Sequence, residues 1–280
     1  MTAPLLEIDD LHVVFRSGGP LRRRSFPALK GVSCSIRPGE TLGLVGESGS
    51  GKTTIGRAIL GLAPVESGTI RFDGREIQSA DARQRRALSE DIQVVFQDPF
   101  SSLNPALTIE QILAEPLVAQ GVPLEKARHR LRELLDRVHL PSDSLSRLPR
   151  EFSGGQRQRV AIARALALSP RLIVCDEPVS GLDLRTQAAV LDLLVEIQQD
   201  TGTALLFVSH DLSVVRRISH RVMVLLHGEV IETGSAAVVT GAPQHPYTQR
   251  LLMSAPVAHP ARQAERRRAR EALDTREAAA

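Results

Sequence analysis

A glycine-rich stretch constrains what this chain can fold into more than any other part of its sequence. Directly after the apolar run 41–45 come Gly46-Glu47-Ser48-Gly49-Ser50-Gly51-Lys52-Thr53-Thr54. They fit the pattern GxxxxGK(S/T), in which backbone N–H groups and the positive end of the following helix surround a polyphosphate. Side chains in place of the glycines would block the phosphates, Lys52 supplies a charge, and the Thr53 hydroxyl is placed to bind Mg²⁺. A turn that matches by chance is the alternative, and supporting motifs elsewhere decide between them.

Composition narrows the class of protein. A chain of 280 residues can form one large domain or a domain with an insert. No run approaches the ~18 apolar residues that span a bilayer, and the amino terminus lacks a secretory signature, so we expect an intracellular protein. Cys34 and Cys175 lie in apolar runs and are expected to be reduced core residues.

The formal charge of +3 raises nucleic acid as a partner, but the residue types argue against it. Arginines are mixed with acidic residues except at 22–24 and 266–268, and aromatic residues make up only 3% of the chain. Few platforms for stacking bases therefore exist. We expect solvated surface arginine and no nucleic-acid partner, with acidic lipid head groups or phosphates as a minor alternative.

The first part of the chain is predicted to be β-rich. Short strands are expected at 6–15, 31–36 and 42–45, and an edge strand with a turn at 68–74. Residues 16–27 read as a flexible surface loop. Phe15 and Phe26 both offer a flat apolar face for an adenine base. We choose Phe15 at the end of its strand, although a core position suits it equally well.

The middle of the chain becomes helical after a buried strand at 91–96, which ends at Gln97. Thr108 with Gln111 forms a capping box, and Pro123 opens a helix whose apolar face runs through 127–138. Ser153-Gly154-Gly155-Gln156 precedes a further helix, where exposed amides and a hydroxyl converge as a second anion-binding end. Taken alone, that motif equally describes an ordinary capped helix.

Two later strands deliver polar residues to the same sheet edge. The apolar run 172–175 is typical of a central parallel strand and ends at Asp176-Glu177. We expect Asp176 to bind Mg²⁺ through water and Glu177 to polarise an attacking water, the alternative being a solvated strand end. A parallel strand at 203–208 ends near His210, within reach of a terminal phosphate. A hairpin at 223–233 and a helical appendage from 235 follow, and the tail after 262 reads as a solvated helix or disordered.

Six features in fixed order resemble the nucleotide-binding subunit of ATP-binding cassette (ABC) transporters over roughly residues 5–235: the glycine-rich stretch, Gln97, Ser153–Gln156, Asp176-Glu177, the turn Ser180–Asp183 and His210. The resemblance implies ATP and Mg²⁺ as cofactors, with hydrolysis carried by Glu177, His210 and Gln97. It implies that Gln97 also contacts the metal, that Ser153–Gln156 is the family's signature motif, and that Asp183 lies at the nucleotide.

The implied fold is α/β, with a RecA-like P-loop core, an antiparallel β subdomain and an inserted α-helical subdomain. Residues 1–98 and 170–234 would form the ATP-binding core, 99–169 the helical subdomain, and 235–280 a carboxyl-terminal extension. Phe100–Pro105, Ile112–Leu117 and the HPYT element within Gln244–Leu252 are similar to the dipeptide, oligopeptide and nickel importers. Phe152 replaces a usual leucine, Gly181 a frequent alanine, and a carboxyl-terminal cysteine cluster is absent, so no iron–sulfur cluster is expected.

The resemblance implies an ATP-hydrolysing importer subunit at the cytoplasmic face of the cell membrane, driving uptake of a peptide-like substrate, nickel or another small solute. Its partners would be a second ATPase subunit, same or homologous, in a head-to-tail dimer, and two permease subunits. An extracytoplasmic substrate-binding protein would act indirectly. A soluble ABC ATPase acting on nucleic acid and a nucleotide-gated interaction module are the alternatives.

Overall fold

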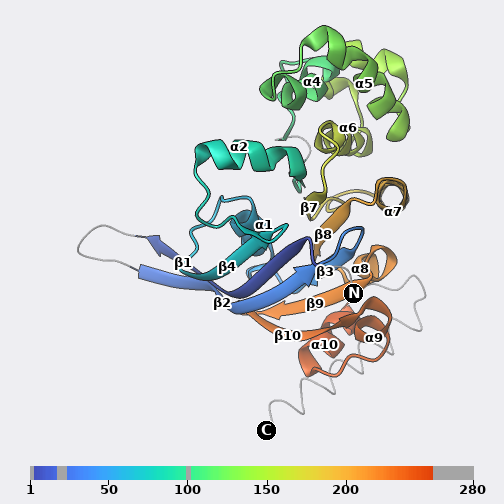
Figure 1. Ribbon diagram of the computed structural model, residues 1–280. Coiled ribbons are helices and arrows are strands. Elements are labelled where there is room, and N and C mark those ends of the chain that lie inside the picture. Colours follow the sequence, from blue (N-terminus) through green and yellow to red (C-terminus); the bar gives the residue numbers. More distant parts are fainter. Residues whose placement is uncertain (1–2, 18–23, 99–101, 255–280) are drawn as a thin grey trace.

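Two β-sheets and a set of helices make up the molecule, which a computed structural model describes for residues 3–17, 24–98 and 102–254 (Figure 1). The predictions for Phe100, both arginine clusters and the tail beyond 254 fall outside these ranges, except for Arg24. The strands are β1 (Leu6–Ser17), β2 (Arg24–Ile36), β3 (Thr41–Val45), β4 (Ser67–Phe72), β5 (Arg75–Glu76), β6 (Ile92–Val95), β7 (Leu172–Asp176), β8 (Ala204–Ser209), β9 (Arg221–Leu226) and β10 (Glu229–Ser235).

The α-helices are α1 (Lys52–Ile59), α2 (Ala82–Asp91), α4 (Ile109–Ala119), α5 (Leu124–Arg137), α6 (Gly154–Leu166), α7 (Leu184–Thr201), α8 (Leu212–Ile218), α9 (Ala236–Gly241) and α10 (Pro246–Ser254). Two short 3₁₀ helices, Ser142–Ser146 and Pro149–Glu151, lead into α6. In the described ranges, no helix has the length and apolar character needed to cross a bilayer.

The six-stranded sheet has the order β10-β9-β3-β8-β7-β6. From β9 to β6 every neighbouring pair is parallel, and β10 joins as the antiparallel arm of a hairpin with β9. Strands β3 and β8 are buried throughout, as expected when helices cover both faces of a parallel sheet. Because the carboxyl ends of β3, β8 and β7 meet at one edge, the residues that follow these three strands become neighbours.

The smaller sheet is antiparallel, with the order β2-β1-β4-β5. Its β1–β2 pairing extends from Leu6 with Ile36 to Ser17 with Arg24. The prediction of a flexible loop over 16–27 is therefore wrong for 16–17 and 24–27, and residues 18–23 lie outside the described ranges. The sequence hides this pairing, because the paired ends carry exposed residues such as Arg16 and Arg24 and show no apolar alternation.

One further strand lies elsewhere than expected, and one helix was not expected. Strand β4, expected at an edge, lies between β1 and the two-residue strand β5. Helix α2 was not predicted, since none of its residues is buried and no apolar period marks it. An Asp81–Gln84 capping box begins it, and the Arg85 guanidinium ties it to the carbonyls of Ile59 and Ile77.

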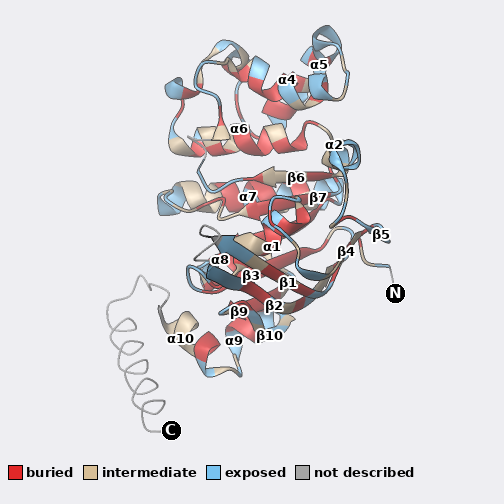
Figure 2. Cartoon of the chain, turned by 90° about the vertical axis from the view of Figure 1, so that its left-hand side faces the viewer, coloured by how far each residue is buried: buried red, intermediate tan, exposed pale blue. Residues whose placement is uncertain are grey.

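Helices α4, α5 and α6 pack together at one end of the molecule, away from the antiparallel sheet (Figures 1 and 2). The predicted apolar face of α5 is buried in their shared core, and the Thr108–Gln111 capping box begins α4 as predicted. At the other end, α9 and α10 lie beside the β9–β10 hairpin (Figure 1). Both cysteines are free thiols, and burial raises the pKa of Cys34 and of Cys175 to about 12.

The central strand β8 should dominate stability. Leu206 is fully buried there, so Leu206→Ala should lower the free energy of unfolding by roughly 2–5 kcal/mol through lost burial and a cavity. Leu62→Ala is the matched control, because the Leu62 side chain is exposed and its loss should cost less than about 0.5 kcal/mol. Chemical denaturation measures both, and equal losses would contradict this description of the core.

Candidate functional site

The glycine-rich stretch forms a loop between β3 and α1, and we call residues 46–52 the phosphate loop. Lys52 begins α1 and is almost fully buried, and its Nζ donates to the carbonyl oxygens of Gly46 at 2.7 Å and Glu47 at 2.8 Å. Burial lowers the pKa of this ammonium, while Glu177, Asp176 and Glu47 oppose the shift. The loop therefore encloses a single positive charge at the start of a helix.

Glycines in the phosphate loop are required for reasons that differ in part from the sequence argument. A Cβ at Gly46 would lie 2.3 Å from the carbonyl oxygen of Leu225, and one at Gly51 (φ 107°) would lie 2.8 Å from that of Ala28. Only Gly49, with φ 82°, faces open space on the loop's surface. Close packing against neighbouring backbone, and not clearance for a ligand alone, thus demands glycine at 46 and 51.

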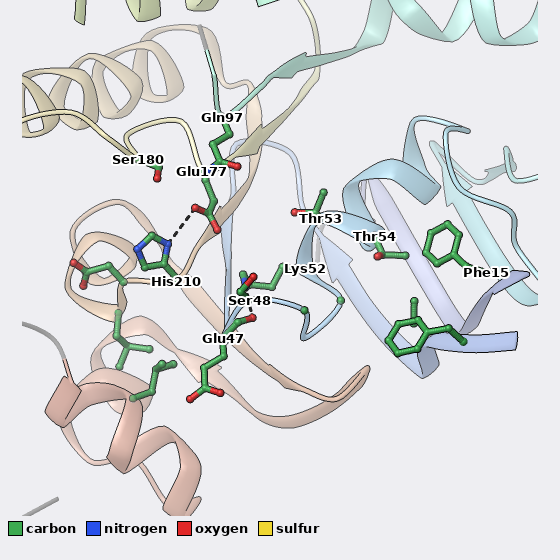
Figure 3. Close-up of a pocket in the computed structure, with 17 residues that line it drawn as sticks. Phe15, Glu47, Ser48, Lys52, Thr53, Thr54, Gln97, Glu177, Ser180 and His210 are labelled. Atoms are coloured by element: carbon green, nitrogen blue, oxygen red, sulfur yellow. Dashed lines mark hydrogen bonds and ion pairs between the residues drawn. The ribbon is translucent and has the colours of Figure 1, made fainter. Parts of the chain in front are cut away.

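A cavity of about 900 Å³ opens over the phosphate loop. Phe15 lies at one end of it and Glu177 with His210 at the other, with the loop between them (Figure 3). Phe26 lines the same cavity and pairs with Phe15 across β1 and β2. The structure therefore brings both candidate aromatics to the site and does not single out Phe15.

Glu177 and His210 meet at the far end of the cavity, where the Glu177 Oε2 lies 3.1 Å from the His210 Nδ1 (Figure 3). The Glu177 backbone has φ 48°, a sparsely populated conformation for a non-glycine residue, and its N–H donates to the Val208 carbonyl at 3.0 Å. This hydrogen bond ties the end of β7 to β8. A carboxylate oriented by a histidine at a phosphate loop is suited to act as a general base.

The three candidate metal ligands also converge. The Thr53 Oγ1 donates to the Asp176 Oδ1 at 2.9 Å, and Gln97 lines both the main cavity and a neighbouring cavity of about 490 Å³ that Asp176 also lines. These are oxygen donors, which suit Mg²⁺, and one carboxylate is the usual protein share when phosphates and waters complete the octahedron. Among the described residues no cluster of three or more His, Cys, Asp or Glu could hold a metal ion by itself.

The signature motif, Ser153–Gln156, does not reach this cavity. Ser153 and Gln156 cap the exposed start of α6 with a reciprocal capping box, and a Cβ at Gly155 would lie 2.2 Å from the Thr186 Cγ2. Asp183 accepts from the backbone of Arg185 and Thr186 as the N-cap of α7, and the Thr186 hydroxyl lowers the Asp183 pKa. In this chain these candidate nucleotide contacts pack against one another, apart from the phosphate loop.

Ser180, which lies in the predicted turn Ser180–Asp183, lines the cavity. Sequence reasoning missed four other residues that line it, namely Ala28, Asp211, Leu212 and Leu251. Asp211 and Leu212 follow the predicted His210, so their position was foreseeable. Leu251 and its neighbour Tyr247 come from α10, and nothing in their local sequence indicates contact with a loop 200 residues away.

A family model described as ABC transporter matches residues 29–180, more than half of the chain. The chain belongs to this family. The matched range holds the phosphate loop, Gln97, the signature motif and the Asp176-Glu177 pair, so the fold-class prediction is confirmed together with the family.

Curated relatives of this family member include the glutathione import ATP-binding protein GsiA of Shigella flexneri, 48% identical over 268 residues, and that of Pectobacterium atrosepticum, 47% identical over 263 residues. The alignments cover 94% and 92% of this chain but 43% and 42% of those proteins. The chain thus spans less than half the length of the curated relatives it matches.

Solved ABC structures share its fold. Clostridium perfringens cbiO1, part of the ABC transporter complex cbiONQ, superposes with a TM-score of 0.75 at 29% identity, covering 85% of this chain and 91% of that one. A dimeric ATP-binding cassette in a post-hydrolysis state, bound to ADP and Pi, gives 0.73 at 30% identity over 82% of this chain and 98% of that one.

Asp176 should make stability depend on pH. Burial raises its pKa, so the native protein holds that proton to a higher pH than the unfolded chain does. Stability is then lost as pH rises through the interval between the two pKa values, and the loss persists above it. Asp176→Asn should therefore melt at or above the wild-type temperature at pH 7, and the gain should vanish below about pH 4, the ordinary carboxyl range.

Thermal unfolding from pH 3.5 to 8 measures this effect, with Asp192→Asn as control. Asp192 pairs with Arg217 on the exposed side of α7, so its substitution should follow the wild-type curve within about 0.5 kcal/mol. A lower melting temperature for Asp176→Asn at pH 7 would contradict a destabilising buried charge.

Proposed function

We propose that the chain is the ATP-hydrolysing subunit of an ABC importer that takes up a peptide-like substrate. The observation that carries this proposal is the single cavity in which the phosphate loop faces the Glu177–His210 pair. A site that only held a nucleotide would need the phosphate loop but no general base. The carboxylate of Glu177, oriented at the far end of the cavity, is suited to activate a water for attack on a terminal phosphate.

The proposal gives a role to each residue at the cavity that the sequence singled out for the nucleotide, the metal or the chemistry. The phosphate loop amides and Lys52 bind the phosphates, and an aromatic face from Phe15 or Phe26 stacks on the adenine. Thr53, Asp176 and Gln97 hold Mg²⁺, which neutralises charge on the transferring phosphate when it is bound. Glu177 takes the proton of the attacking water, and His210 orients that carboxylate and reaches toward the γ-phosphate.

A second ATPase subunit completes the site in this proposal. The signature motif is exposed at the start of α6 and lies apart from this chain's own phosphate loop. A head-to-tail partner, same or homologous, would present its signature motif and Asp183 to the nucleotide held here. The dimeric state of a structural relative that is 30% identical supports this arrangement. Closure of the dimer on ATP and its reopening after hydrolysis would then be the conformational change that is coupled to transport.

The importer assignment rests on the relatives and on the carboxyl-terminal extension. GsiA is named for import of glutathione, itself a small peptide, and the HPYT element at 245–248 resembles the same importer group. Partners in this proposal are two permease subunits at the cytoplasmic face of the membrane and, indirectly, a substrate-binding protein. Residues 1–98 with 170–234 would act as the ATP-binding core, 99–169 as the helical subdomain, and 235–280 as the extension.

Glu177→Gln should retain ATP binding but lower turnover at least 100-fold, because the amide cannot accept the proton of the attacking water. ATP should then accumulate in a closed dimer, which size-exclusion chromatography with ATP and Mg²⁺ detects. Lys52→Ala is the companion variant and should lose ATP affinity itself. Hydrolysis near the wild-type rate in Glu177→Gln would overturn the assignment of the base.

Membrane co-purification separates the proposal from its two alternatives. A tagged chain, expressed in its own cells and extracted in mild detergent, should recover two hydrophobic permease subunits in near-stoichiometric amounts. A nucleic-acid ATPase would instead recover DNA or RNA, and a nucleotide-gated module would recover another partner without ATP turnover. Recovery of no membrane subunit would count against the importer.

A further inference from the structure

We infer that Tyr247, on the carboxyl-terminal helix α10, is a positioning residue that holds the phosphate loop in its binding shape. The inference rests on the proposed nucleotide site and adds to it a residue from outside the loop and its neighbouring motifs. The backbone N–H of Glu47 donates to the Tyr247 hydroxyl oxygen at 2.8 Å. Tyr247 is the chain's one tyrosine, and it is buried to 4% exposure.

Hydrogen bonds hold both peptide groups that flank Glu47. Its carbonyl oxygen accepts from the Lys52 Nζ at 2.8 Å and from the Ser50 amide at 3.2 Å, while its N–H points out of the loop toward Tyr247. Within the described part of the chain, the amides of Ser48 and Gly49 donate to no protein acceptor. Tyr247 thus accepts from the Glu47 amide, which turns outward, and the amides of Ser48 and Gly49 are left for a phosphate.

The hydroxyl that holds Glu47 is itself fixed in place. The Glu232 carboxylate on β10 accepts from the backbone N–H of Gln244 at 2.8 Å and of His245 at 3.2 Å. The His245 Nδ1 in turn accepts from the Tyr247 N–H at 3.1 Å. A strand of the central sheet therefore anchors the start of α10 and prevents the phenol ring from swinging away.

A loop that binds only when correctly shaped loses apparent affinity in proportion to the fraction of molecules that keep that shape. Without its acceptor the peptide group between Gly46 and Glu47 is free to rotate, and the Gly46 carbonyl in that group, which Lys52 contacts at 2.7 Å, rotates with the Glu47 N–H. One lost hydrogen bond of ordinary strength corresponds to a change in the shape equilibrium of roughly 3- to 10-fold. Loss of this hydrogen bond should weaken ATP binding and leave the rate of the chemical step unchanged, because Tyr247 is not part of the Glu177–His210 pair.

Tyr247→Phe tests this, since it keeps the buried ring and removes only the acceptor. The dissociation constant for ATP with Mg²⁺ and the KM for hydrolysis should both rise about 3- to 10-fold. The kcat should stay within twofold of wild type. Hydrogen exchange at the Glu47 amide should speed up at least 5-fold in the full chain without nucleotide, whereas amides in β7 and β8 should keep their protection.

Gln249→Ala is the matched control on the same helix. Its Nε2 donates to the Pro243 carbonyl at 3.0 Å, a contact internal to the extension, so ATP binding and Glu47 exchange should equal wild type. Equal loss in both variants would reduce Tyr247 to a packing residue and overturn the inference. Wild-type affinity and exchange in Tyr247→Phe would overturn it while leaving the proposed function standing, whereas absence of ATP binding in the wild type would overturn both.

Discussion

The buried ammonium of Lys52 is the interaction on which the site depends. An unpaired charge at 4% exposure would be costly, and loop carbonyls and nearby carboxylates share the compensation. Burial lowers the Lys52 pKa while Glu177 and Asp176 oppose that change, and burial raises the Asp176 pKa while Lys52 opposes it. Lys52 and Asp176 therefore stabilise one another's charged forms, so the phosphate loop and the end of β7 behave as one electrostatic unit.

The order of strands makes that unit possible. Strand β8 lies between β3 and β7, and all three run parallel, so the loop after β3 and the acids after β7 flank the His210 end of β8. Backbone hydrogen bonds fix the spacing, including the one from the Glu177 N–H to the Val208 carbonyl. The strands β3 and β8 beneath this charged site are fully buried, and burial of their apolar side chains supplies the free energy that the strained Glu177 backbone costs.

Local signals in the sequence were enough to predict the phosphate loop, the parallel strands and the capping box at Thr108, because each is defined within a few residues. Exposed elements were harder. Helix α2 and the end of the β1–β2 hairpin carry no buried stripe, so periodicity could not reveal them. Phe15 and Phe26 both reach the cavity because β1 and β2 pair there, so the sequence could not decide which of them contacts the adenine. The contact of Tyr247 with Glu47 joins residues 200 apart in sequence. Such features belong to tertiary structure alone.

Phosphate binding at this loop is an exchange of hydrogen bonds. The Lys52 Nζ donates to two loop carbonyls, so contact with a phosphate oxygen replaces neutral acceptors with a charged one, which is the stronger bond. During that exchange the lysine no longer stabilises the loop. Two hydrogen bonds to residues distant in the described sequence do not involve Lys52 and remain: the Gly228 N–H donating to the Ser50 carbonyl at 3.0 Å, and the Glu47 N–H donating to Tyr247. Both come from the carboxyl-terminal third of the chain, so the shape of the loop while it binds is set by residues far beyond the motif that defines it.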